Sequence, residues 1–230
     1  MNAVSRRKIE MGKRALEFTV AHPDTEPGTT TAATRLEQLV ARAEDTATAQ
    51  RDGFIRARAA TARKRELRQA MLTVPIAHLA EVGRAAAREE HELGKSFVFK
   101  PGVDTFLAFR TAARGMASAA QTHREVLAKH GLAQPVLDEF VQMLDQFDAA
   151  VALGNDGRAA HVGATRELRA VAVEIVRTVR VMDGRNRQRF ADDGQLLGSW
   201  ISASTVVRTP RANTEPAGEA SAGGEVRPAA

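Results

Sequence analysis

Residues 135–182 read PVLDEFVQMLDQFDAAVALGNDGRAAHVGATRELRAVAVEIVRTVRVM. Apolar side chains recur in this stretch at alternating intervals of three and four residues, which is the a/d spacing of a helix that packs along a neighbour. They are Leu137, Phe140, Leu144, Phe147 and Val151 in the first half, and Leu168, Ala172, Ile175, Val179 and Met182 in the second. The spacing therefore predicts a long helix with a single apolar seam.

The middle of this stretch contains a competing signal. Residues 154–157 are Gly-Asn-Asp-Gly, which by itself is typical of a turn. The heptad phase is nevertheless kept across the 17 residues from Val151 to Leu168. We therefore favour one helix from Pro135 to about Met182, ended by the Asp-Gly pair at 183–184, over two helices joined by a turn.

Two further rods of similar length are predicted outside this stretch. One is a helix over 30–72, which contains no proline, and the other is a broken pair of helices over 76–130. The break at 95–102 (KSFVFKPG) contains several residues that favour β-strands, but no other segment could pair with it as a strand. We therefore interpret it as a short apolar segment, or plug, that packs between the two helices. Asp104 is the expected N-cap of the helix that follows. Pro75, between the two rods, is interpreted as a tight turn rather than a kink.

The composition favours the same fold class. Only 4% of the 230 residues are aromatic and none is tyrosine, whereas β proteins draw on aromatic and β-branched residues. We predict an all-α protein, an elongated antiparallel helical bundle of three long helices, one of them broken, with short N- and C-terminal helices. The scarce aromatics, Phe54 included, are expected to act as packing anchors on the helix faces.

The expected domain organisation is simple. Residues 1–208 are predicted to form a single helical-bundle domain, with an N-terminal helix over 1–21, a linker over 22–29 and a last helix over 195–207. The tail over 209–230 is rich in Pro, Ala, Gly, Ser and Glu and buries too little apolar area to offset the entropy of ordering, so we predict that it is disordered.

Several classes of chemistry lack the residues they need. The chain has no cysteine, and none of its six histidines follows a Glu or Asp by three positions, as a di-metal site in a helical bundle requires. Gly-rich phosphate loops, Gly-x-Ser-x-Gly and His-Glu-x-x-His are also missing from the sequence. We expect a protein that is not an enzyme and holds no cofactor or metal. Charged residues at 10, 13, 14 and 17 interrupt the apolar stretch that a secretory signal needs, so we expect a cytoplasmic protein, and the lack of cysteine agrees with that location.

Basic residues concentrate in the stretch RDGFIRARAATARKRELR at 51–68, within a chain of formal net charge +5. The candidate nucleic-acid-binding residues are Arg56, Arg58, Arg63, Lys64, Arg65 and Arg68. They point around much of the helix circumference and have only Phe54 nearby for base stacking, so we favour a solvated helix over a phosphate-binding surface.

A second candidate site follows from the heptad register across residues 154–165. The register places Arg158, His161 and Thr165 where apolar residues are expected, and polar side chains at a helix seam can fix register or bind a ligand. A wet or uncovered seam is the simpler interpretation of this buried polar cluster, and we favour it.

Several phrases resemble those of a group of uncharacterised bacterial Ala/Arg-rich helical proteins of similar length. They are TARKRELR (61–68), FRTAARGM (109–116), LDQFDAAV (144–151), RAAHVGA (158–164) and VMDGRNRQRF (181–190), so the resemblance covers most of the chain apart from the tail. No function or catalytic residue comes with the resemblance, which implies a stand-alone helical protein rather than a fragment of an enzyme.

The sequence thus predicts a non-enzymatic protein that acts by protein–protein association, self-association included, or as a structural element. Nucleic-acid or anionic-surface binding through residues 51–68 is the alternative. No small-molecule substrate and no integral membrane segment are expected.

Overall fold

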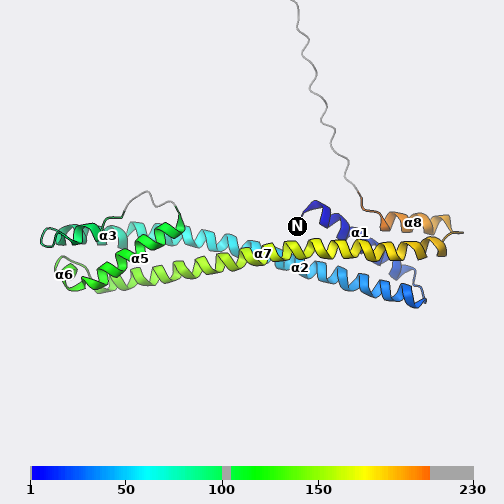
Figure 1. Cartoon of the computed structure of the whole chain (residues 1–230), viewed down its shortest axis with the longest axis horizontal. Helices are drawn as coiled ribbons and strands as arrows, with labels where there is room; N and C mark the ends of the chain where they lie inside the picture. The colour runs from blue at the N-terminus through cyan, green and yellow to red at the C-terminus, as the bar shows by residue number, and fades with distance from the viewer. Residues whose placement is uncertain (1, 100–104, 208–230) are drawn as a thin grey trace, which may run out of the picture.

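The computed structural model describes residues 2–99 and 105–207, and helices are the only regular secondary structure in these two ranges. Their bounds are Ala3–Ala21 (α1), Pro27–Thr73 (α2), Pro75–Ala86 (α3), Leu93–Ser96 (α4), Phe106–Thr122 (α5), Arg124–Lys129 (α6), Gln134–Arg189 (α7) and Gly194–Ser204 (α8). The molecule is a long rod in which α2 and α7 lie side by side and the shorter helices gather at the two ends (Figure 1). The prediction of an elongated all-α bundle is confirmed.

Two predictions lie outside the described residues. They concern the N-cap Asp104 and the disordered tail over 209–230. The described N-cap of α5 is Thr105, whose hydroxyl accepts a hydrogen bond from the Ala108 amide at 3.1 Å. At the other end of the chain α1 has the predicted extent, but the linker to α2 is shorter than predicted because Pro27 already occupies the first turn of α2.

α7 runs without interruption through residues 154–157, so the predicted long helix is confirmed and the turn is excluded. The predicted end at Asp183-Gly184 is wrong, because the helix continues to Arg189. Contacts with other elements hold its last turns. Asp183 accepts a hydrogen bond from Trp200 Nε1 of α8 at 2.9 Å, and Arg189 donates to the backbone carbonyl of His22 at 2.9 Å. These contacts offset the helix-propensity cost of a glycine, about 1 kcal/mol.

The α2–α7 pair is held by heptads on both helices. The buried positions of α2 follow the three-and-four spacing over its length: Leu36, Leu39, Ala43, Thr46, Gln50, Gly53, Ala60, Leu67 and Met71. Their size changes along the helix, from large apolar residues at both ends to small or polar residues in the middle. The middle of the pair therefore buries little apolar area, and hydrophobic stabilisation is concentrated at the ends.

The two helices touch backbone to backbone at Gly53 and Gly157. A Cβ atom added at Gly53 would lie 2.8 Å from Gly157 O, and one added at Gly157 would lie 2.7 Å from the amide nitrogen of Ala57. Real Cβ atoms do not approach backbone atoms this closely. Glycine at both positions is thus a requirement of the crossing, and the Gly-Asn-Asp-Gly motif supplies a helix contact instead of a turn.

Each end of the rod has its own hydrophobic core. One core joins α3, α4, α5 and α6 to Leu67 and Met71 of α2 and to the start of α7, around the fully buried Phe109, Phe140 and Phe147. The other joins α1 to the remaining ends of α2 and α7, around Trp200 from α8 and residues such as Met11, Leu36 and Ile175. Each large buried side chain contributes about 1.5–3 kcal/mol relative to its exposed state.

The broken rod over 76–130 is divided into α3, α4, α5 and α6, with α3 ending earlier than predicted, and it does not run the length of the pair. α5 and α6 turn back over the end formed by Leu67 and Phe147, and none of their buried residues joins the core around Trp200. The physical reason is the Ala- and Gly-rich middle of the pair, which gives a third helix little apolar surface to cover. The central section of α2–α7 therefore remains a two-helix structure.

Pro75 is the first residue of α3, yet the chain does not reverse there. α3 continues α2 outward at the same end of the rod (Figure 1). Val74 keeps a right-handed helical conformation, and its amide and carbonyl both form helical hydrogen bonds, with Ala70 and His78. Proline thus interrupts a helix that continues, and the interpretation as a tight turn is replaced by a kink.

We expect Gly53→Ala and Gly157→Ala each to destabilise the protein by about 1–3 kcal/mol, because the new methyl group forces the two backbones apart. Gly163→Ala is the matched control on α7, where a Cβ meets no atom within 4 Å. This control should stabilise the protein by up to about 1 kcal/mol through helix propensity. Urea unfolding followed by circular dichroism measures all three, and equal stabilisation at the three positions would contradict the close crossing.

Candidate functional site

The arginines of residues 51–68 divide into two rows on α2. Arg51, Arg58 and Arg65 lie seven residues apart on one exposed face, which we call the outer row. Arg56 and Arg63, also exposed and seven apart, line the edge of α2 that faces α7, which we call the edge row. The basic residues thus point around much of the circumference of α2, and its exposed arginines form two rows on different faces.

Lys64 and Arg68, the other two sequence candidates, belong to the packing against α5. Lys64 Nζ lies 4.6 Å from the centre of the Phe106 ring, and the Arg68 guanidinium carbon lies 5.4 Å from the centre of the Phe109 ring. Both side chains are half-buried. Burial, with a smaller contribution from the nearby Arg158 charge, lowers the pKa of Lys64. These two cations are thus engaged in cation–π contacts within the fold.

Acidic partners neutralise several other arginines. Arg110 and Arg114 of α5 bind Asp148 of α7, with Arg114 also 2.6 Å from Asp145. Within the part of the chain that the structure describes, no carboxylate lies within ion-pair distance of the outer row or of Arg56. Within residues 51–68 these four cations are therefore available to an external anion.

The polar cluster predicted at Arg158, His161 and Thr165 has a different membership. His161 and Thr165 are half-buried at the seam, but Arg158 is exposed, and the buried residue next to it is Gly157. Its place is taken by Gln50, which is 6% exposed and donates to Thr165 Oγ1 at 2.6 Å. His161 Nδ1 lies 3.0 Å from the Gln50 backbone oxygen. The cluster ties α2 to α7 next to the glycine crossing.

Sequence reasoning missed Gln50 and misjudged Phe54. Gln50 could have been found from the heptad of α2, where it lies seven residues from Ala43 and three from Gly53. Phe54, expected to be a packing anchor, is 52% exposed, and its ring centre lies 5.9 Å from that of His161. It is i+3 from Arg51 and i−4 from Arg58, so it lies beside the outer row.

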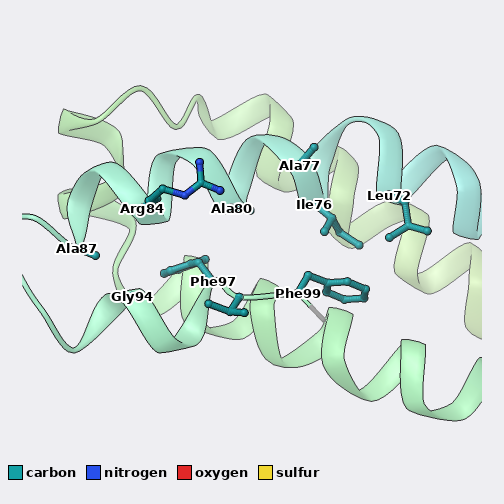
Figure 2. Close-up of a pocket in the computed structure, with 10 residues that line it drawn as sticks. Leu72, Ile76, Ala77, Ala80, Arg84, Ala87, Gly94, Phe97 and Phe99 are labelled. Atoms are coloured by element: carbon teal, nitrogen blue, oxygen red, sulfur yellow. The ribbon is translucent and has the colours of Figure 1, made fainter. Parts of the chain in front are cut away.

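A hollow of about 420 Å³ lies at the end of the rod that contains α3, between α3 and residues 94–99 (Figure 2). Phe97 and Phe99 face Ile76 and its neighbours across it. Among its lining residues Arg84 is the single charged side chain, so it has neither an acid–base pair nor a nucleophile to offer. Phe97 is itself 2% exposed and packs against Gly83, as the predicted apolar plug should. The hollow is a packing feature.

Neither a metal site nor a membrane span is found in the described ranges. Residues 2–99 and 105–207 contain no group of three His, Asp or Glu side chains placed to hold a metal ion. A search of the same residues finds no helix with the length and apolar character needed to cross a bilayer.

Comparisons with known proteins give no match. No protein-family model matches this chain, and no match is found among curated proteins or solved structures. The resemblance to Ala/Arg-rich bacterial proteins therefore stays a prediction from the sequence.

Asp148 provides a pH test of the contacts that hold α5. Burial raises the pKa of the Asp148 carboxyl, but hydrogen bonds from Arg110 and Arg114 outweigh it and hold the pKa below its ordinary value of 3.8. A lowered carboxyl pKa stabilises the fold above pH 4, and this stabilisation is lost as the pH falls and the folded state is protonated.

We therefore expect Asp148→Asn to lower the free energy of unfolding at pH 7 by about 1–2 kcal/mol, and the difference from the parent to shrink below pH 4. Urea unfolding at pH 7, 4 and 3 measures this. Glu139→Gln, exposed on the same helix, is the control and should show little change at any pH. A deficit of Asp148→Asn that stays constant from pH 7 to 3 would contradict the assignment.

Proposed function

We propose that the protein is an elongated, non-enzymatic scaffold that acts by protein–protein association through the central section of α2–α7. The observation that carries the proposal is the exposure of large apolar side chains in that section. Phe54 is 52% exposed, Ile55 51% and Leu153 58%. Exposed apolar side chains on a section that no third helix covers can form an interaction site.

The architecture supports this role. The two cores stabilise the ends of the rod, so the central section can present a surface without having to supply the stability of the fold. The backbone contact at Gly53 and Gly157 keeps the pair narrow and fixes the relative position of the two helices. A partner that covers the centre would complete a bundle that the chain leaves at two helices. We propose that this association takes place in the cytoplasm, the location expected from the sequence.

Site-specific photocrosslinking tests the proposal. A photoreactive phenylalanine derivative in place of Ile55 or Leu153, introduced into the full chain expressed in cells, should give protein adducts on irradiation. The control is the same derivative in place of Val20 of α1, which is 74% exposed and lies outside the central section. Adducts at the central positions and few at position 20 are the expected result, and equal yields at all three positions would argue against a central interaction site.

Nucleic-acid binding is a second candidate, and the outer row is the observation that favours it. Arg51, Arg58 and Arg65 carry no ion pair in the described residues and are spaced along one face of α2. The exposed Phe54 ring beside them offers an aromatic surface, and stacked bases use such surfaces in single-stranded complexes. Phosphate contacts from three arginines would make binding to single strands depend on salt with a log–log slope of about −2.

Gel-shift titrations with single-stranded DNA and RNA at several salt concentrations test this candidate. Reversing Arg51, Arg58 and Arg65 together to Glu should abolish the shift. Reversing Arg166, Arg169 and Arg177 of α7, which are also exposed, changes the net charge equally and should leave most of the binding in place. Equal loss in both triple variants would indicate a net-charge effect, and no shift at low salt would exclude the candidate.

A further inference from the structure

An apolar groove of about 420 Å³ lies between α2 and α7 beside the central section. Ala59 and Ala60 of α2 and Ala149 and Ala150 of α7 line it, together with Leu153, which is 58% exposed. The edge row of arginines forms one rim. Leucine and short alanine side chains leave room for another helix to approach the pair closely.

The groove lies on the flank of the pair that α5 does not cover. α5 holds α7 through Asp148 and packs Phe106 on Phe147, whereas the groove residues of α7 include Gln146 and Ala149. Positions 146 and 148 point in nearly opposite directions from a helix, at about 100° per residue. Among the described residues, no helix covers this flank.

Polar pairs join α2 to α7 along this flank at multiples of seven residues. They are Arg35 with Glu174 at 2.7 Å, Arg42 with Glu167 at 2.8 Å, and Arg63 with Gln146 at 2.9 Å. The same spacing places Leu153 opposite Arg56. Arg56 therefore lies opposite an apolar side chain, whereas Arg35, Arg42 and Arg63 each lie opposite a hydrogen-bond acceptor. No described residue neutralises the charge of Arg56.

An unpaired acid lies on α7 about one helical turn from the groove residue Leu153. Asp156 follows Leu153 by three residues on α7, is exposed, and forms no ion pair with any described residue. The groove thus has an apolar floor, with an unpaired cation on its α2 rim and an unpaired carboxylate one turn beyond it on α7. A surface with both charges can be complementary to itself.

From this self-complementarity we propose that the groove is occupied by a second copy of this chain. The inference rests on the proposed function and names the partner. The two copies lie side by side, related by a two-fold axis parallel to α2, so that α2 of each packs on α7 of the other and a four-helix bundle forms at the centre. Arg56 is then level with the partner's Leu153, about one helical turn from the partner's Asp156, and the ion pair forms twice.

Charge also excludes the other closed two-fold arrangement. An axis across the rod at the groove would pack α2 antiparallel on α2 of the partner and bring Arg56 next to the partner's Arg63. Like charges in an interface oppose association. The parallel arrangement avoids this contact and leaves the Arg35 and Arg42 pairs level with the same pairs of the second copy.

Sedimentation velocity of the full chain over a range of concentrations tests the proposal. The parent should dimerise. Arg56→Asp alone and Asp156→Arg alone should each raise the dimer Kd by at least about tenfold, because two like-charge contacts replace two ion pairs. The double variant R56D/D156R should recover dimerisation. An equimolar mixture of the two single variants should also recover it, since the charges are complementary only between unlike chains.

Arg51→Asp is the control for the charge change itself, because it lies on the outer row away from the groove. It should leave the dimer Kd unchanged, and circular dichroism should show that all variants keep the helical content of the parent. A parent that stays monomeric at concentrations on the order of 100 µM would overturn the proposal. A dimer Kd that is unchanged in both single variants would also overturn it. If every photocrosslinked adduct at Leu153 contains another protein and none contains a second copy of this chain, the proposed dimer is wrong. The protein–protein association proposed above would still be supported.

Discussion

The backbone contact between α2 and α7 at Gly53 and Gly157 is the constraint on which the rest of the structure depends. Atoms of the two backbones are so close there that a Cβ at either glycine would overlap them. Helices at this distance leave no volume for large side chains between them, so the seam on both sides of the contact is made of alanine, glycine and hydrogen-bonded polar groups. Gln50 and Thr165 are part of that polar seam.

A seam of this kind buries little apolar area, and the stability of the rod has to come from elsewhere. It comes from the two ends, where aromatic and long aliphatic residues of the short helices meet the ends of the pair. The helices α3 to α6 gather over one end of the pair because large apolar side chains are available to them there. Phe109 and Leu127 find large buried apolar neighbours around Phe147, whereas the seam further along the pair consists of small and polar residues.

The uncovered centre links the fold to the proposed function. Where a third helix is missing, apolar side chains such as Leu153 stay exposed, and charges such as those of Arg56 and Asp156 stay unpaired within the described chain. Beside α5, by contrast, Asp148 is neutralised by two arginines. The combination of exposed apolar side chains and unpaired charges on an uncovered flank is what suggests association at the centre.

The sequence by itself determined the all-α class, the long final helix and its passage through residues 154–157, because heptad phase is a local property that each helix carries in its own side chains. It did not determine that α7 continues past Asp183, since that depends on Trp200 and on the chain before α2. Nor did it determine the exposure of Arg158 and Phe54. Periodicity shows which face of a helix is apolar, but only the tertiary structure decides how far a neighbouring helix extends to cover that face.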